Sequence, residues 1–170
     1  HNYTRQLLND FAKNKINVDL IYFKYSKDPE YTTTYDEIKV LKCLKISCFQ
    51  KLWNVIRLPI FWPIFTVRFS WKLLLFIIEL NMVKKYDFIY LDHQQMFIYG
   101  LFFKKQKKIL MAHDVMYQRY LRRYNYLIAK IVAFSENFFL KQRNSIVCSF
   151  SEKDKAMIFS IYKRKSIVVN

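Results

Sequence analysis

The chain has 170 residues, of which 53% are hydrophobic and 25% charged, and this composition excludes an intrinsically disordered protein. Its length is typical of one domain with a sizeable core. The formal net charge of +16 favours acidic partners, namely nucleic acid, anionic lipid or phosphorylated ligands. A solvated basic surface explains the charge equally well.

The periodicity of the apolar residues predicts alternating helices and strands in the first quarter of the chain. We expect a helix at residues 4–15, a strand at 17–25, a polar loop at 27–34 and a half-exposed strand at 38–46.

The apolar stretch at residues 49–82 admits two interpretations. It does not qualify as a membrane span, which needs about 20 apolar residues with few charges. From residue 66 its pattern predicts a helix packed on a sheet. The alternative is an amphipathic segment that rests on a membrane interface through Trp53, Trp62 and Trp71. The interrupting residues are Arg57, Pro59, Pro63, Arg68, Lys72 and Glu79.

The alternation becomes regular after residue 85 and determines the predicted fold class. Strands that alternate with helices pair in parallel through crossover connections. We therefore expect a Rossmann-like three-layer α/β sandwich with a mostly parallel sheet, and a single domain over residues 1–170. The expected strands are residues 86–91, 108–112, 145–150 and 166–169, and the expected helices are residues 94–103, 116–142 and 151–162.

Ligands bind at the carboxyl ends of the strands in such sheets, and this rule selects the candidate site. His113-Asp114 follows the strand at 108–112, where histidine can bind a sugar hydroxyl or phosphate or move a proton. The alternative is that Asp114 caps the next helix. Asp92-His93-Gln94-Gln95 is a second polar cluster at an equivalent position, with helix capping as an equally weighted alternative.

Four further observations narrow the chemistry. Gly100 is the single glycine, so the glycine-rich loops of dinucleotide dehydrogenases and P-loop ATPases are absent from these residues. Ser151 to Asp154 matches a capping box, for which we favour a structural role. Arg119 belongs to a basic and aromatic helix start, which is either a solvated face or a surface for phosphate, anionic lipid or nucleic-acid contacts. The cysteines and histidines show no metal-binding spacing, so no metal site is expected.

The order of these motifs resembles the N-terminal half of a GT-B glycosyltransferase of family 4. The segments that carry the resemblance are KYDFIYLDHQQ, KKILMAHDVMYQRYLRR, SIVCSFSEKDKAMI and SIVVN, over residues 84–170. Matching positions are Tyr86-Asp87, His113-Asp114, Arg119, Ser151-Glu152-Lys153-Asp154 and Asn170. Departures are Val169, where the family has proline, and the missing first strand with its glycine-rich loop.

The resemblance implies a function and a set of site residues. The intact enzyme would be a retaining hexosyltransferase without metal or other cofactor, acting on a nucleotide-sugar donor and a lipid-linked or glycan acceptor in bacterial polysaccharide biosynthesis. His113 would lie near the transferred sugar and donor phosphate, with Asp114 supporting the crevice. The substrate-binding residues would be His93, Gln95, Arg119, Ser151 and Glu152.

The resemblance also implies how the chain is organised and where it acts. We expect a fragment without the C-terminal nucleotide-sugar-binding domain, inactive alone, on the cytoplasmic face of an anionic bacterial plasma membrane. Alternatives are a basic nucleic-acid-binding module, the less favoured partner class, and a membrane-surface scaffold without activity.

Overall fold

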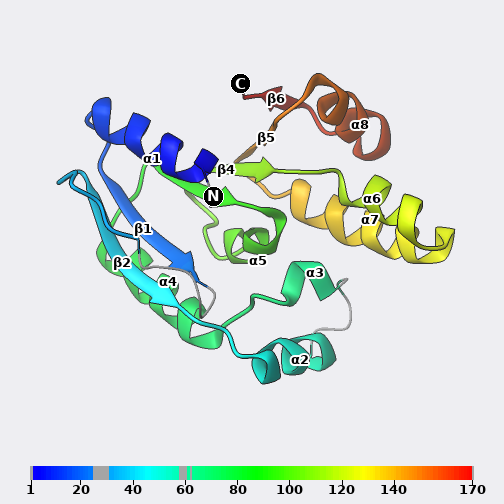
Figure 1. The fold of residues 1–170 in the computed structure, drawn as a ribbon, viewed down its shortest axis with the longest axis horizontal. Helices are drawn as coiled ribbons and strands as arrows, with labels where there is room; N and C mark the ends of the chain where they lie inside the picture. Colours follow the sequence, from blue (N-terminus) through cyan, green and yellow to red (C-terminus); the bar gives the residue numbers. More distant parts are fainter. Residues whose placement is uncertain (1, 25–30, 58–60, 62, 170) are drawn as a thin grey trace. The chain divides into compact units, whose positions relative to one another are not determined.

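The computed structural model describes residues 2–24, 31–57, 61 and 63–169 (Figure 1). These residues form two compact units, His1–Cys48 and Phe49–Asn170. Both units combine helices with parallel strands, and this confirms the predicted mixed α/β fold class. The predicted positions Tyr25, Pro59, Trp62 and Asn170 lie outside the described residues.

The first unit is a helix followed by two parallel strands. Helix α1 (Asn2–Lys13) precedes β1 (Val18–Phe23) and β2 (Ile38–Leu44), with Val18 opposite Ile38. The described part of the predicted loop, residues 31–34, contains neither helix nor strand. A small apolar core forms because the apolar side of α1 meets the strands: Leu8, Ala12 and Ile38 are buried, with Phe11, Val18, Leu20, Tyr31 and Tyr35 packed around them.

The second unit is built on four parallel strands in the order β3-β4-β5-β6. The strands are β3 (Phe88–Asp92), β4 (Lys107–Ala112), β5 (Ser145–Ser149) and β6 (Ser166–Val168). The helices are α2 (Cys48–Arg57), α3 (Pro63–Thr66), α4 (Trp71–Val83), η1 (Gln94–Met96), α5 (Phe97–Gly100), α6 (Met116–Arg123), α7 (Tyr126–Leu140) and α8 (Glu152–Tyr162). No helix within the described ranges is long and apolar enough to cross a membrane.

The register of this sheet brings consecutive strand ends to one edge. Asp92 at the end of β3 pairs with Met111 of β4, and Ala112 at the end of β4 pairs with Ser149 of β5. The middle strands are apolar and buried, as expected for a parallel sheet covered by helices. Side chains without exposed surface in this core include Leu110, Val147, Ala129, Val132, Phe139 and Leu140.

The prediction of one continuous helix at residues 116–142 is wrong, because the chain breaks at Tyr124 and Asn125. Tyr124 has an extended backbone, and the Asn125 side chain accepts a hydrogen bond from the Ile128 N–H at 3.0 Å. Asparagine competes in this way with helix continuation and starts a new helix instead. The predicted helix at 94–103 is likewise shorter and begins with the 3₁₀ turn η1.

The last turn of α5 is held by buried polar side chains. Lys108 of β4 donates from Nζ to the carbonyl oxygens of Gly100 and Phe103, and burial lowers the pKa of this ammonium. Gln142 donates from Nε2 to the Phe97 carbonyl at 2.8 Å. A Cβ on Gly100 would clash with Gln142 Oε1 and Leu91 Cδ1, so a larger residue here would displace both side chains.

A single buried carboxylate joins three helices. Glu136 of α7 accepts the N–H groups of Met116 and Tyr117, at 2.9 and 3.0 Å, and the hydroxyl of Tyr162. It thereby satisfies the first N–H groups of α6, which have no partner inside the helix. Burial raises the pKa of Glu136 to about 7, although these three hydrogen bonds lower it.

Glu136 predicts a pH-dependent stability. Between about pH 4.5 and about pH 7 the Glu136 carboxyl group is protonated in the folded chain and ionised in the unfolded chain. The free energy of unfolding therefore falls as pH rises through this window, by about 3 kcal/mol. Glu136→Gln, which does not titrate, removes this slope in urea unfolding at a series of pH values. The exposed control Glu152→Gln retains it, and an equal slope in both variants would contradict the assignment.

Candidate functional site

Side chains from three strand ends meet at the carboxyl edge of the β3-β4-β5 sheet. His93 follows β3, His113 follows β4, and their rings stack with centroids 3.5 Å apart and planes inclined by 15°. The Phe150 ring, after β5, packs edge-to-face against the His113 ring, with the ring centroids 4.8 Å apart. The parallel register places these residues together, so two predicted site residues, His93 and His113, share one location.

A hydrogen bond to a carboxylate fixes the His113 imidazole. Its Nε2 lies 2.6 Å from Asp92 Oδ1, and both side chains are about one-fifth exposed. A carboxylate is an acceptor only, so the Nε2 atom carries the proton. Asp92 belongs to the second polar cluster noted in the sequence, but the predicted set of site residues omitted it. Only pairing of the strands shows that it reaches the histidine of the next strand.

The backbone at His93 is strained. Its φ of 69° and ψ of 146° fall in a region that side-chain-bearing residues rarely adopt, at a cost of about 1–3 kcal/mol. Such strain concentrates at functional sites, where the surrounding structure maintains it. Here the unusual backbone turns the chain sharply after β3 and is associated with the stacked position of the His93 ring.

Burial lowers the pKa of His93, and the nearby His113 and Arg68 lower it further, whereas the Asp92 carboxylate raises it. The net direction keeps this imidazole neutral at neutral pH. The stacked pair therefore combines a neutral ring with a ring that is hydrogen-bonded to a carboxylate. Such a pair can bind hydroxyl or phosphate oxygens and can exchange a proton.

The site also contains potential metal ligands. One ligand atom from each of Asp92, His93 and His113 lies within 4.8 Å of the other two. A zinc ion bound by histidine lies about 2.0–2.1 Å from the nitrogen, along its in-plane lone pair. Rings that stack nearly face to face cannot both direct a lone pair at one ion. The geometry is that of a stacked imidazole pair, and metal binding would require one ring to turn.

Asp114 does not cap helix α6, contrary to the alternative considered from the sequence. The position before that helix is Val115, and Glu136 takes the helix N–H groups. The exposed Asp114 carboxylate instead lies 3.4 Å from the guanidinium of the predicted site residue Arg119. This pair is at the rim of the site.

Gln94 links the two polar clusters. Its buried amide donates to the backbone carbonyl oxygen of Asp114 at 2.5 Å and so ties η1 to the loop after β4. The predicted site residue is the half-buried neighbour Gln95 instead. Residue type cannot separate two adjacent glutamines, because only the direction of the 3₁₀ turn decides which one points inward.

Ser151 and Glu152 belong to the start of helix α8. Ser151 Oγ accepts from the Asp154 N–H at 3.0 Å and donates to the Asp154 carboxylate at 2.6 Å. The exposed Glu152 pairs with Lys155 at 3.0 Å. These contacts confirm the capping of this helix by Ser151 that the sequence favoured. The substrate-binding roles implied by the resemblance stay predictions.

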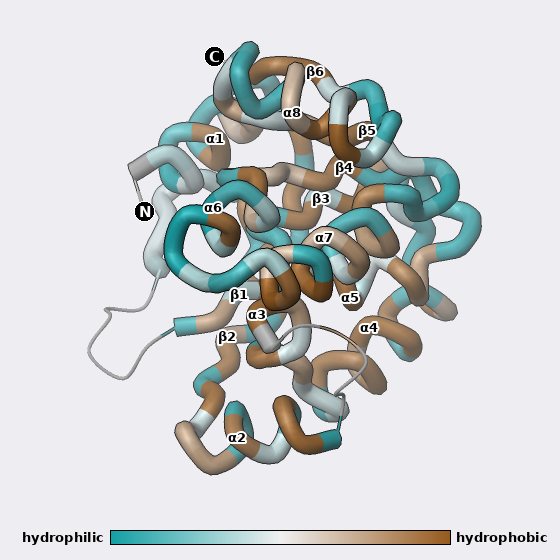
Figure 2. The backbone as a smooth tube through the Cα atoms, turned by 90° about the vertical axis from the view of Figure 1, so that its right-hand side faces the viewer, coloured by the Kyte–Doolittle hydropathy of each residue, from teal (hydrophilic) through white to brown (hydrophobic). Residues whose placement is uncertain are grey.

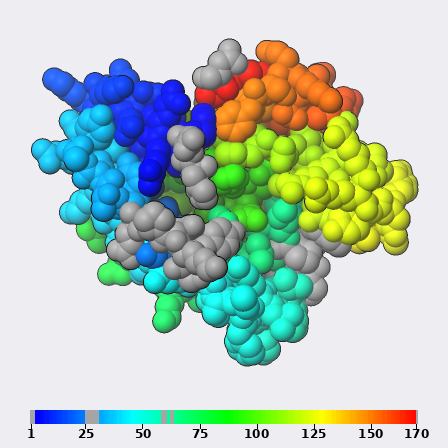
Figure 3. Space-filling model, in the orientation of Figure 1, coloured from blue at the N-terminus to red at the C-terminus, as the bar shows by residue number. Residues whose placement is uncertain are grey.

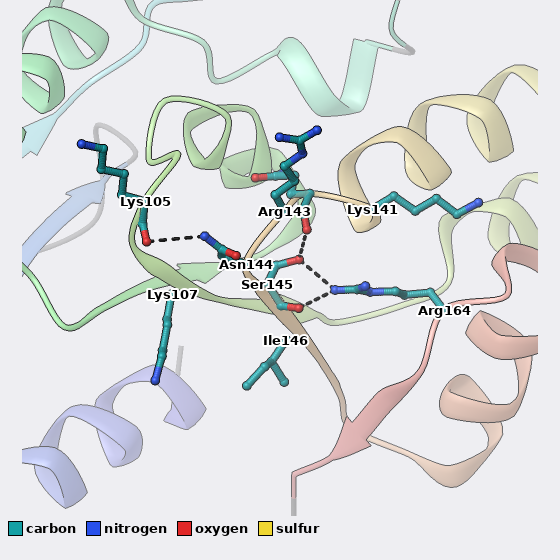
Figure 4. Close-up of a pocket in the computed structure, with 9 residues that line it drawn as sticks. Lys105, Lys107, Lys141, Arg143, Asn144, Ser145, Ile146 and Arg164 are labelled. Atoms are coloured by element: carbon teal, nitrogen blue, oxygen red, sulfur yellow. Dashed lines mark hydrogen bonds between the residues drawn. The ribbon is translucent and has the colours of Figure 1, made fainter.

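A shallow basic depression lies at the opposite end of the sheet, at the amino ends of β4 and β5 (Figure 4). Figure 4 shows the side chains of Lys105, Lys141 and Arg143 pointing in different directions, while Arg164 points to Ser145. The Arg164 guanidinium donates to the backbone oxygen and the hydroxyl of Ser145. No carboxylate lines this depression; its described lining residues are Lys105, Lys107, Lys141, Gln142, Arg143, Asn144, Ser145, Ile146 and Arg164.

The chain matches no protein-family model, no curated protein and no solved structure. Functional assignment therefore depends on the geometry above and on the resemblance of the motifs.

The burial of His93 predicts an imidazole pKa below 6.5, measured by NMR titration of the ring protons. Asp92→Asn removes the carboxylate that raises this pKa and should lower it further. A value at or above 6.5 in the native chain, or a rise in the variant, would show that the ring is not buried against its neighbours in this way.

Proposed function

We propose that the chain is the acceptor-side half of a retaining glycosyltransferase that moves a sugar from a nucleotide-sugar donor to a lipid-linked or glycan acceptor. The observation that carries the proposal is the Asp92–His113 pair beside a stacked His93 at the carboxyl edge of a parallel sheet. This edge is where α/β proteins bind their ligands. The resemblance to family 4 of the GT-B enzymes supplies the reaction class.

The proposed roles follow from the contacts of each residue. Asp92 is a positioning residue, because it orients the His113 ring through Nε2. His113 and the neutral His93 offer their imidazoles to sugar hydroxyls or to the donor phosphate, and Arg119 at the rim attracts the negative charge of the donor. The nucleotide-sugar would be held mainly by a second domain, so this chain alone should not transfer sugar.

The proposed setting is the cytoplasmic face of a bacterial plasma membrane, where a lipid-linked acceptor resides. The support is the formal charge of +16, since each Lys or Arg near an anionic surface contributes about 1 kcal/mol of attraction.

The direct test is transfer of a labelled sugar by the complete polypeptide that contains this chain together with its nucleotide-sugar-binding domain. His113→Ala should lower turnover at least about 100-fold, because a hydrogen-bonding and proton-moving group at the reacting centre is lost. Circular dichroism verifies folding. Lys13→Ala, an exposed change on α1, serves as the control and keeps full turnover. Unchanged turnover in His113→Ala would remove this residue from the site.

A second candidate function is a non-catalytic nucleic-acid-binding module, and the basic depression favours it. Five cationic residues line the depression, and they are Lys105, Lys107, Lys141, Arg143 and Arg164. Their spread in Figure 4 suits an extended polyanion better than a single phosphate group. Cations around such a surface neutralise backbone phosphates without reading the base sequence.

This second function predicts salt-dependent binding of RNA in a gel-shift assay. Lys141→Gln combined with Arg143→Gln removes two cations, which should reduce the slope of log affinity against log salt by about 1.4–1.8. Lys13→Gln combined with Lys15→Gln removes the same charge from the first unit and should leave the slope unchanged. Absence of a shift, or an equal change in both double variants, would eliminate the module.

A further inference from the structure

Helix α2 presents its apolar side to solvent. Phe49, Leu52, Trp53 and Ile56 are 76%, 60%, 44% and 59% exposed. At about 100° per residue, these four positions fall within an arc of about 100° on the helix surface. Figure 3 shows the atoms of this helix at the molecular surface, in cyan. A helix of a globular protein normally turns such a face inward.

The opposite side of α2 is attached to the protein through a polar side chain. Asn54 is the buried residue of this helix, and its Nδ2 donates to the carbonyl oxygens of Val67 and Phe69, at 3.3 and 2.6 Å. The same segment is held by Tyr99, whose hydroxyl donates to the Arg68 carbonyl and accepts from the Ser70 N–H, both at 2.8 Å. The helix is therefore docked with its polar side inward and its apolar face free for a partner.

Aromatic and cationic groups on this face suit a membrane interface. The Phe49 and Trp53 rings stack with centroids 6.4 Å apart, and the Arg57 guanidinium lies 4.5 Å above the Trp53 ring. Tryptophan is enriched at the level of the lipid headgroups, and arginine extends from there toward the anionic groups.

The charge around α2 selects an anionic surface. Residues 49–78 contain no Asp or Glu, and their four cations are Lys51, Arg57, Arg68 and Lys72. Helix α4, later in the chain, also has an exposed apolar stripe, formed by Trp71, Leu75, Ile78 and Met82. Figure 2 shows α4 largely brown. A protein partner with an apolar patch would not require this one-sided charge, whereas an anionic bilayer attracts it.

We infer that α2 is an in-plane anchor that lays its apolar face into the interface of an anionic bilayer. This membrane anchor adds to the membrane setting of the proposed function. It rests on that function only for the presence of a lipid-linked acceptor. Vesicle binding needs no sugar transfer, so the two are tested separately.

The experiment is co-flotation of the complete chain with vesicles of phosphatidylglycerol and phosphatidylethanolamine, against vesicles of phosphatidylcholine alone. Binding should favour the anionic vesicles and weaken with salt. Leu52→Ser combined with Ile56→Ser should lower the partition constant at least about tenfold, because apolar burial is lost. Phe159→Ser combined with Ile167→Ser removes similarly exposed apolar groups from α8 and β6 and should retain binding.

A variant with Trp53 as its single tryptophan (Trp62→Phe, Trp71→Phe) reports the depth of insertion. Its emission should shift to shorter wavelength on anionic vesicles and be quenched by brominated lipid. Equal binding to both vesicle types, equal losses in the two double variants, or no shift of Trp53 emission would each overturn the inference. So would a dimer in solution that the Leu52 and Ile56 changes dissociate, because a second copy would then cover this face.

Discussion

The in-register parallel pairing of β3, β4 and β5 is the constraint on which the candidate site depends. It brings Asp92, His113 and Phe150 to one edge, although they lie about 20 and about 40 residues apart along the chain. A shift of one residue in the β3–β4 register would move Asp92 away from the His113 ring and turn the side chains of the shifted strand to the other face. The hydrogen bond between Asp92 and His113, the stacked rings and the strained turn at His93 all presuppose this register.

Buried polar groups maintain the loops that leave this edge. Glu136 holds the start of α6, directly after the loop that carries His113, and Gln94 binds the backbone of the same loop. Each of these side chains gives a buried backbone group the hydrogen-bond partner that water would otherwise provide. A buried backbone group without such a partner costs free energy. The site is thus supported from α7, η1 and α8, and a change far from the histidines can alter their geometry.

The alternating pattern predicted the strands and most of the helices, because apolar periodicity reports which face of an element is buried. It also predicted the edge at which His93 and His113 meet. It could not predict the Asp92–His113 bond or the ring stack, which depend on which strands become neighbours. The break at Asn125 was missed because apolar residues continue across it, and a single side-chain hydrogen bond decides it. Helix α2 was also not predicted. Its apolar side faces outward and a single asparagine, Asn54, attaches it to the protein, so its pattern is not that of a helix with a buried apolar face.

The two proposals assign different parts of the second unit to different tasks: the sheet edge to chemistry, and α2 to the membrane. The central claim is that Asp92 acts on sugar transfer through His113, and a double-mutant cycle of Asp92→Asn and His113→Ala on turnover of the complete enzyme tests it. If Asp92 works only by orienting His113, the double variant should be no slower than His113→Ala, with a coupling energy of at least about 1 kcal/mol. Additive losses from the two substitutions would contradict the account.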